Sequence, residues 1–265
     1  MPDAHPPDQE DADAPTHEAH RRALAEHTPT PDPTSPFAAV LTAAVAPWGF
    51  ALEPVQRDRL ERHYHAMIAA NRRMNLTRIT EPRDAAVKHY ADSLAVWSWS
   101  RRRNAPVRTV LDVGTGAGFP AVPLAVVWPD VAITAIDGTN KKIAFVKDAC
   151  RSIGLDNLTA VHARAERWDS GATFDMVVVR AVAPLATVLA HAHRRVARDG
   201  YFIAYKTASL DEQEARDGLR VAARRGLVLH ERFPYALTCE DATLRRALYI
   251  FRRSSPLKKS VGPTC

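Results

Sequence analysis

Cysteine is scarce in this sequence of 265 residues, and its scarcity argues against two classes of protein. The three cysteines are Cys150, Cys239 and Cys265. Their odd number and wide spacing speak against a disulfide framework and against a clustered zinc site. We therefore expect a protein of a reducing compartment, the cytoplasm, without a metal centre.

Long apolar runs are missing as well. The first 36 residues lack the apolar segment of a secretory signal. The one uncharged stretch, residues 37–52, is too short to span a bilayer comfortably and is interrupted by Pro47 and Gly49. It predicts a buried helix followed by a turn, and we expect no contact with a membrane.

Negative charge is concentrated at one end of the chain. Residues 1–35 hold eight acids, two arginines and many prolines, a net charge of −6, which predicts a disordered tail. Because the whole chain carries +6, residues 36–265 carry +12. Such a basic surface suits a polyanionic partner such as RNA, but from charge alone a merely solvated surface is an equal alternative.

Apolar periodicity predicts helices from residue 37 to about 100. The apolar positions at helical spacing are Leu60, Tyr64, Met67, Ile68 and Met74, followed by Val87, Tyr90, Ala91, Leu94 and Trp97. Thr80, Glu81 and Pro82 predict the start of the second helix, with Thr80 as its N-cap. These helices would form a small cap.

After residue 106 the pattern changes to short apolar runs separated by helical segments. The runs are VRTVLDVG, VAITAID, NLTAVHA, FDMVVVRA, GYFIAYKT, LVLHERF and RRALYIFRR. Strands alternating with helices predict an α/β fold, a mostly parallel sheet with helices on both faces. The last two runs lack a helix between them and predict an antiparallel hairpin. We expect a tail at 1–36, a helical cap at 37–104, a ligand-binding domain at 105–253 and a basic tail at 254–265.

A glycine-rich loop, DVGTGAGFP, follows the first predicted strand. Gly114, Gly116 and Gly118 allow a tight turn and a close approach of the backbone to a ligand. A dinucleotide fingerprint would place its third glycine at position 119, where Phe119 stands. The spacing G-x-G-x-G after Asp112 is better suited to an adenosyl ligand that has no pyrophosphate.

Two further strand ends are expected beside this loop. Asp137 ends the second predicted strand, where its carboxylate can accept the ribose hydroxyls, and Ala165 and Glu166 follow the third, where they can frame an adenine. Ligands of doubly wound sheets bind beyond the carboxyl ends of the strands. The alternative is that the glycines only turn a strand into a helix and the acids are only solvated, and the three strand ends taken together disfavour it.

The fourth predicted strand lacks two catalytic motifs. It ends VVVRAVAPL, without the Asn/Asp-Pro-Pro-aromatic motif that exocyclic amine methylation uses and without a cysteine nucleophile for pyrimidine carbon. A ring nitrogen with an in-plane lone pair, such as guanine N7, needs neither, because positioning opposite a sulfonium methyl group supplies most of the catalysis.

Several linked motifs resemble one family. NRRMNLTRITEPRDAAVKHYADSLAVW, VLDVGTGAGFPAVPLAVVWPD, KKIAFVKDACRSIGLDNLTAVHARAE, FDMVVVRAVAPL and GYFIAYKT are similar to the RsmG (GidB) family. Those proteins are bacterial 16S rRNA methyltransferases that modify guanine N7 with S-adenosylmethionine. The resemblance covers roughly residues 60–207, and RRALYIFRR resembles the family's last strand. It implies a Rossmann-like class I methyltransferase fold and 16S rRNA or a small-subunit precursor as partner.

The resemblance also implies roles for individual residues. S-adenosylmethionine would be contacted by Gly114, Phe119, Ala165, Glu166 and Arg180. Candidates for substrate binding are Asn75, Lys88, His89, Asp92, Ser93 and Lys206, since N-L-T matches residues 75–77 and R-H-x-x-D-S matches 88–93 with Lys88 in place of arginine. Arg180 and His89 would position the base. The chain departs from the family at Ala121, at Gly138 to Asn140 and at Thr207.

Other interpretations of the same residues remain open. A non-catalytic RNA-binding relative of the same fold and a nicotinamide oxidoreductase are the alternatives. The pairs His63/His65 and His191/His193 are poor metal ligands, because side chains two apart on a helix point nearly opposite ways. The stretch WSWSRRR, residues 97–103, is better interpreted as a core tryptophan and a solvated interdomain loop than as an RNA contact. We expect a monomer.

Overall fold

The structure, a computed structural model, describes residues 35–49, 51–168, 170–239 and 242–253. Nearly all of the predicted acidic tail and of the predicted basic C-terminal tail lies outside these residues. Among the described helices, none is long and apolar enough to cross a membrane.

The N-terminal part of the chain is helical, as the periodicity predicts. Its elements are α2 (Pro36–Val45), the 3-10 turn η1 (Ala46–Trp48), α3 (Pro54–Met74), α4 (Pro82–Ala85), the π-helical turn η2 (Ala86–Ala91) and α5 (Ala95–Arg103). The buried helix and turn expected within residues 37–52 are confirmed as α2 and η1. The prediction that Thr80 is the N-cap of this helix, α4, is wrong. Glu81 is the N-cap, because Pro82 occupies the first helical position and holds the residue before it extended.

Among the described residues, seven strands form one sheet, one for each predicted run. They are β1 (Thr109–Val113), β2 (Ala132–Asp137), β3 (Leu158–His162), β4 (Phe174–Arg180), β5 (Val196–Thr207), β6 (Leu227–Cys239) and β7 (Ala242–Arg253). Their order is β3-β2-β1-β4-β5-β7-β6, parallel from β3 to β5, with β7 antiparallel to both β5 and β6. The predicted closing hairpin is therefore confirmed.

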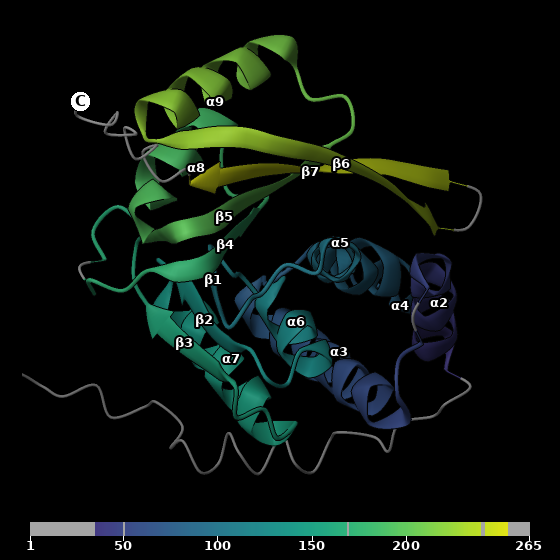
Figure 1. The fold of residues 1–265 in the computed structure, drawn as a ribbon. Coiled ribbons are helices and arrows are strands. Elements are labelled where there is room, and N and C mark those ends of the chain that lie inside the picture. Colours follow the sequence, from purple (N-terminus) through teal and green to yellow (C-terminus); the bar gives the residue numbers. More distant parts are fainter. Residues whose placement is uncertain (1–34, 50, 169, 240–241, 254–265) are drawn as a thin grey trace, which may run out of the picture.

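Helices cover both faces of the sheet (Figure 1). The remaining helices are α6 (Ala121–Val127), α7 (Asn140–Ser152), α8 (Leu185–Ala192), the 3-10 turn η3 (His193–Arg195) and α9 (Glu212–Arg224). Side chains alternate along each strand, so Val110 packs toward α6 and α7, whereas Leu111 packs toward α8 and α9. The parallel strands are buried on both faces, which explains their nearly continuous apolar sequences.

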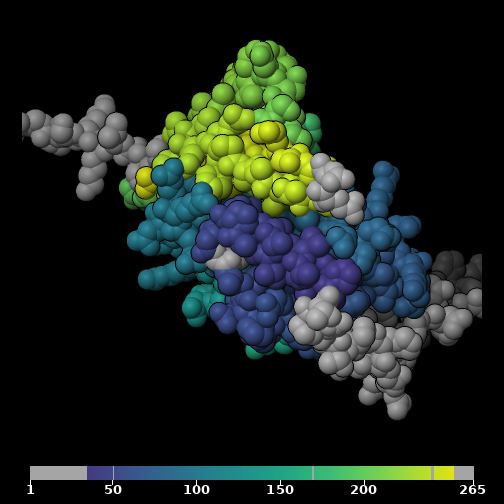
Figure 2. Space-filling model, turned by 90° about the vertical axis from the view of Figure 1, so that its right-hand side faces the viewer, coloured from purple at the N-terminus to yellow at the C-terminus, as the bar shows by residue number. Residues whose placement is uncertain are grey.

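The N-terminal helices belong to the same layer as α6 and α7. Phe37, Tyr90 and Trp99 share one hydrophobic core with Ile133 and Ile203 of the sheet. In Figure 2 the hairpin β6–β7, in yellow, lies directly against the helices drawn in purple and blue. The boundary expected at residues 104–105 falls between α5 and β1, and the core is continuous across it.

In the stretch WSWSRRR, the predicted core tryptophan is confirmed, but the predicted loop after it is wrong. Trp99 is fully buried, and its indole N–H donates to Glu231 on β6 at 2.9 Å. The arginines that follow form the last turn of α5 instead of a loop, because the helix continues to Asn104, a C-cap with positive φ. Arg103 pairs with the same Glu231 at 2.6 Å, so this end of α5 is fastened to the hairpin.

Candidate active site

The carboxyl ends of four neighbouring strands surround a cavity of about 370 Å³. Its wall consists of residues from the ends of β1 and β2, from the loops that follow β1 to β4, and from α8: Val113, Gly114, Ile136, Asp137, Gly138, Thr139, Ala163, Arg164, Ala165, Glu166, Val182, Ala183, Thr187, Val188 and His191. Four of the residues predicted to hold the cofactor, Gly114, Asp137, Ala165 and Glu166, lie at this wall. The volume is in the range of a small-molecule site. We refer to it as the cofactor cavity.

The glycine loop keeps its backbone close to this cavity. Gly114 has a φ of +77°, and a Cβ atom added to it would lie 2.5 Å from Cγ2 of Val182. A side chain at position 114 would therefore be strained and would collide with Val182. Gly118, with a φ of +95°, leaves space for Val122 instead. Gly116 and Gly118 shape the turn without lining the cavity.

Asp137 fastens the glycine loop to the end of β2. Its carboxylate accepts the backbone N–H groups of Gly116 at 3.0 Å and of Thr139 at 2.8 Å. A carboxylate has about four acceptor positions, so Asp137 can still accept a hydroxyl from the cofactor cavity. At the wall of the same cavity, Oε2 of Glu166 lies 3.9 Å from Nδ1 of His191.

Asp112 and Phe119 were predicted as cofactor contacts, but neither lies at the wall of the cofactor cavity. The side chain of Asp112 is fully buried and accepts the N–H of Ala121 at 3.1 Å, which joins β1 to the start of α6. Burial raises the pKa of Asp112 to about 7. Phe119 packs inward, with its ring stacked on His89 at 4.7 Å between centroids. Both side chains pack inside the protein and support the glycine loop.

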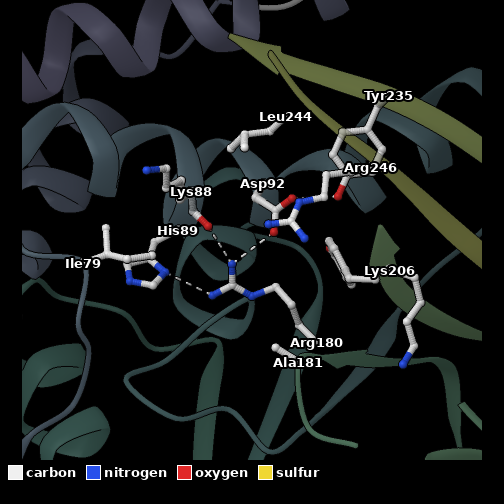
Figure 3. Close-up of a pocket in the computed structure, with 11 residues that line it drawn as sticks. Ile79, Lys88, His89, Asp92, Arg180, Ala181, Lys206, Tyr235, Leu244 and Arg246 are labelled. Atoms are coloured by element: carbon white, nitrogen blue, oxygen red, sulfur yellow. Dashed lines mark hydrogen bonds and ion pairs between the residues drawn. The ribbon is translucent and has the colours of Figure 1, made fainter. Parts of the chain in front are cut away.

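Figure 3 shows the lining of a second cavity, of about 320 Å³. It is lined by Ile79, Lys88, His89, Asp92, Arg180, Ala181, Tyr205, Lys206, Tyr235, Leu244 and Arg246, from the N-terminal helices, β4, β5 and the hairpin. The two cavities border the same turn after β4, since Ala181 lines this one and Val182 lines the other. Ala181 has a φ of +55°, a strained conformation for a residue with a side chain. We refer to this space as the base cavity.

Arg180 is the central cation of the base cavity. Its Nη1 donates to the Lys88 carbonyl at 3.0 Å and to Asp92 at 3.2 Å, and its Nη2 lies 3.5 Å from Nδ1 of His89. Figure 3 shows the guanidinium pointing toward these partners. The side chain is only 13% exposed, and its guanidinium lies 5.3 Å from the centre of the Phe119 ring. Arg180 was expected both to contact the cofactor and to position the base, and the structure places it at the base cavity.

His89 is held in one neutral form. Arginine has no acceptor, so Nδ1 of His89 must accept from Arg180, and the ring proton is on Nε2, which lies 2.7 Å from Oγ1 of Thr77. Burial, together with the positive charge of Arg180, lowers the pKa of His89 to about 3. An imidazole of this kind is uncharged at neutral pH and a poor general base. Its position makes it a support for Arg180.

The unusual helix between α4 and α5 places these groups. His89 lies within the six-residue π-helical turn η2, and Asp92 directly follows it. Such turns are rare and are frequent at functional sites. Oδ1 of Asp92 accepts the hydroxyl of Tyr235 at 2.7 Å, while Oδ2 accepts from Arg180. Asp92 thus connects β4, β6 and the N-terminal helices.

Of the other predicted substrate residues, two line the base cavity and two do not. Lys88 pairs with Asp84 at 2.7 Å, and Lys206 donates to the Ala183 carbonyl at 3.0 Å and to Glu214 at 2.7 Å. Ser93 is fully buried and does not line the base cavity. Asn75 is exposed and ends α3 with a φ of 50°, a role for which asparagine is well suited.

Sequence reasoning missed Asn71 and Tyr235. The Asn71 amide donates to the Thr77 carbonyl at 3.0 Å and accepts the Thr77 N–H at 2.9 Å, so it orients the residue that contacts His89. An amide four residues before the helix-ending Asn75 is the signal that could have identified Asn71. No comparable signal precedes Tyr235, which reaches the site only through the hairpin. Within the described ranges, no group of three or more His, Cys, Asp or Glu side chains could hold a metal ion.

Comparison with known proteins shows similarity over most of the chain. A ribosomal RNA small subunit methyltransferase G of Staphylococcus saprophyticus is 36% identical over 224 residues, which cover 83% of this chain and 91% of that protein. One of Bacillus pumilus is 31% identical over 222 residues, which cover 82% and 91%. A solved structure described as the conversion of a disulfide bond into a thioacetal group during echinomycin biosynthesis has a TM-score of 0.50 and 18% identity, over 60% of this chain and 81% of that one.

The sheet order and these similarities confirm the predicted fold, that of class I methyltransferases. Residues 56–229 match the GidB family, described as rRNA small subunit methyltransferase G. The chain therefore belongs to the GidB family of small-subunit rRNA methyltransferases.

Proposed function

We propose that this protein transfers a methyl group from S-adenosylmethionine to N7 of a guanine in 16S rRNA. The observation that carries this proposal is the pair of cavities that border the turn after β4, with Arg180 at one cavity and Val182 at the other. Class I methyltransferases need such an arrangement, because the methyl donor and the acceptor base must lie in line at one boundary.

The residues that line the cofactor cavity suit S-adenosylmethionine. Gly114 leaves room for a ligand beside the backbone, Asp137 has free acceptor positions for ribose hydroxyls, and Ala165 and Glu166 lie where an adenine would be framed. When bound, the cofactor supplies an electrophilic sulfonium methyl group. In this assignment Phe119 and Asp112 act indirectly, by supporting the loop.

The base cavity fits an acceptor that keeps no proton on its reacting atom. Guanine N7 attacks through an in-plane lone pair, so no protein group has to remove a proton first. His89 is neutral with its Nε2–H directed to Thr77, and Asp92 accepts from both Arg180 and Tyr235, so neither is free to act as a base. Their role is to hold Arg180.

Arg180 can recognise guanine through the O6 atom. Arginine commonly donates to guanine O6 and N7 together, but in this reaction N7 must stay free for attack. A guanidinium already held by the Lys88 carbonyl, Asp92 and His89 has a fixed direction, which favours donation to O6 alone. We therefore assign to Arg180 the positioning of the base.

Mass mapping of 16S rRNA tests the proposal. Small subunits from a strain that lacks the gene should gain one methyl group at a guanine when incubated with the purified protein and S-adenosylmethionine. Replacement of the target guanosine by 7-deazaguanosine should abolish transfer while RNA binding is retained, because only the attacking nitrogen is lost. Binding without any transfer would favour a non-catalytic RNA-binding relative, and methylation of the deaza substrate would refute N7 as the acceptor. Small subunits are cytoplasmic in bacteria, so we expect the protein there.

A further inference from the structure

A cluster of cationic side chains lies at the edge of the sheet opposite the two cavities. A surface hollow of about 480 Å³ is lined by Thr173, His193, Arg194, Val196, Arg224, Arg225 and Arg253. Thr173 precedes β4, whereas Arg180 ends it. Since a strand rises about 3.3 Å per residue, the seven residues of β4 separate this hollow from the base cavity by roughly 20 Å.

The positive charge of this hollow is not balanced at its lining. None of the described residues that line it is acidic, and among the described side chains Arg194, Arg224 and Arg225 have no ion pair within 4.0 Å. Arg224 and Arg225 stand at the end of α9, where cations also stabilise a helix. That effect accounts for the arginines of one helix end, but not for Arg194 and Arg253, which reach the hollow from η3 and β7.

The clustering of these cations is unfavourable for Arg253. One of its Nη atoms donates to the His193 carbonyl, and its buried Nε has no partner among the described residues. Burial also lowers the pKa of Arg253, and the pKa of His193 is lowered by burial and further by the charges of Arg225 and Arg253. Cations gathered in this way repel one another, and an anion in the hollow would relieve the repulsion.

We propose that the hollow formed by His193, Arg194, Arg224, Arg225 and Arg253 binds phosphate groups of the rRNA backbone, at a second contact remote from the target base. The inference rests on the proposed function, which supplies a polyanionic substrate large enough to reach both edges of the sheet. Backbone phosphates fit better than a single small anion, because the hollow is broad and its arginines come from three separate elements. The substrate must then extend well beyond the methylated loop.

Charge reversal on α9 tests this second contact in the full-length protein. The variant Arg224→Glu/Arg225→Glu should raise the KM for small ribosomal subunits at least ten-fold. Its kcat at saturating subunits and its Kd for S-adenosylmethionine should stay within two-fold of the wild-type values. The dependence of log(kcat/KM) on log salt concentration should become shallower by about 1 to 2, as each lost phosphate contact removes slightly less than one unit. Both arginines are exposed, so the fold should persist, and a thermal melt verifies it.

A matched control lies on the same helix. Arg216→Glu/Arg220→Glu makes the same change in net charge, but these arginines pair with Glu212 and Asp217 and do not line the hollow. The control should change KM less than two-fold. Equal effects of both variants, or no effect of the first, would overturn the proposal. If the wild-type protein transfers no methyl group to any subunit, the proposed function fails, and filter binding of 16S rRNA to the same variants still decides whether the hollow binds RNA.

Discussion

The guanidinium of Arg180 and the carboxylate of Asp92 lie 3.2 Å apart, although 88 residues separate them in the sequence. The pair joins the end of β4 to the residue that follows η2. Because both side chains are largely buried, removal of one partner leaves an uncompensated charge, which typically costs about 3 to 5 kcal/mol. The shape of the base cavity therefore depends on this ion pair between β4 and the N-terminal helices.

Arg180→Lys should lower the rate of methyl transfer about ten-fold to a hundred-fold, with the Kd for S-adenosylmethionine unchanged. Lysine keeps the charge, but its single nitrogen cannot reach the Lys88 carbonyl, Asp92 and His89 while also contacting a base. Single-turnover rates on small subunits and calorimetric titration of the cofactor measure the two quantities. A weakened cofactor affinity with a normal rate would place Arg180 in the cofactor cavity after all.

His89→Asn should lower the transfer rate about ten-fold at every pH from about 6 to 9, without moving a pH midpoint. The pKa of His89 is about 3, so the side chain is neutral throughout this range and its loss removes a support for Arg180 instead of a proton acceptor. The rate of the wild-type protein should be nearly flat over the same range. A bell-shaped or sigmoid profile that disappears in the variant would contradict this assignment.

Asp137→Ala should weaken S-adenosylmethionine binding by roughly ten-fold to over a hundred-fold, which corresponds to about 1.5 to 3 kcal/mol for a hydrogen bond to a charged group. The melting temperature of the free protein should fall too, since the N–H groups of Gly116 and Thr139 lose their acceptor. Asp137→Asn, which keeps one acceptor oxygen, should show smaller changes in both. Unchanged cofactor binding in the alanine variant would limit Asp137 to a structural role.

Gly114→Ala should impair cofactor binding by ten-fold or more and destabilise the protein by about 1 to 3 kcal/mol, because φ is positive there and the new methyl group meets Val182. Adding Val182→Ala removes the collision but not the backbone strain. The double variant should therefore recover part of the lost stability, as measured by chemical denaturation. A double variant as unstable as the sum of the single ones would show that Val182 does not limit this position.

Asp112→Asn should change how stability depends on pH. The pKa of Asp112 is raised in the folded protein to about 7 from the ordinary value of 3.8, so the unfolded state releases the proton first as pH rises. The stabilising contribution of Asp112 is then lost between about pH 4 and 7, on the order of 1 kcal/mol per pH unit, and this loss levels off above pH 7. Asparagine does not titrate. Denaturation curves at pH 5, 6, 7 and 8 should show an increasing advantage of the variant up to pH 7, and a constant difference would contradict the raised pKa.

The strands and the cofactor cavity could be predicted from sequence because each depends on local patterns. Apolar runs define the parallel strands, and parallel strands bring their carboxyl ends to one edge, so Gly114, Asp137 and Glu166 had to meet. The base cavity depends on tertiary packing. Asn75 belongs to a recognisable motif but serves a helix end, and Tyr235 carries no motif yet contacts Asp92 through the hairpin.

Side-chain direction explains the remaining differences. Phe119 lies in the glycine loop and Arg180 at a strand end, positions where a cofactor contact is a natural expectation. The ring of Phe119 instead turns into the aromatic cluster of His89 and Tyr90, and the strained turn at Ala181 separates Arg180 from the cofactor cavity. Neither direction can be read from spacing along the chain.

The continuous core between the N-terminal helices and the sheet restricts how substrate choice can change in this protein during evolution. A recognition domain joined by a linker can be exchanged between enzymes as a unit, whereas these helices supply His89 and Asp92 and share one hydrophobic core with the sheet. Exchange of residues 36–103 for another sequence would disrupt the hydrophobic core that these helices share with the sheet before it altered the base that is recognised. New substrates must therefore be reached by stepwise substitutions within the base cavity, each of which preserves the packing behind it.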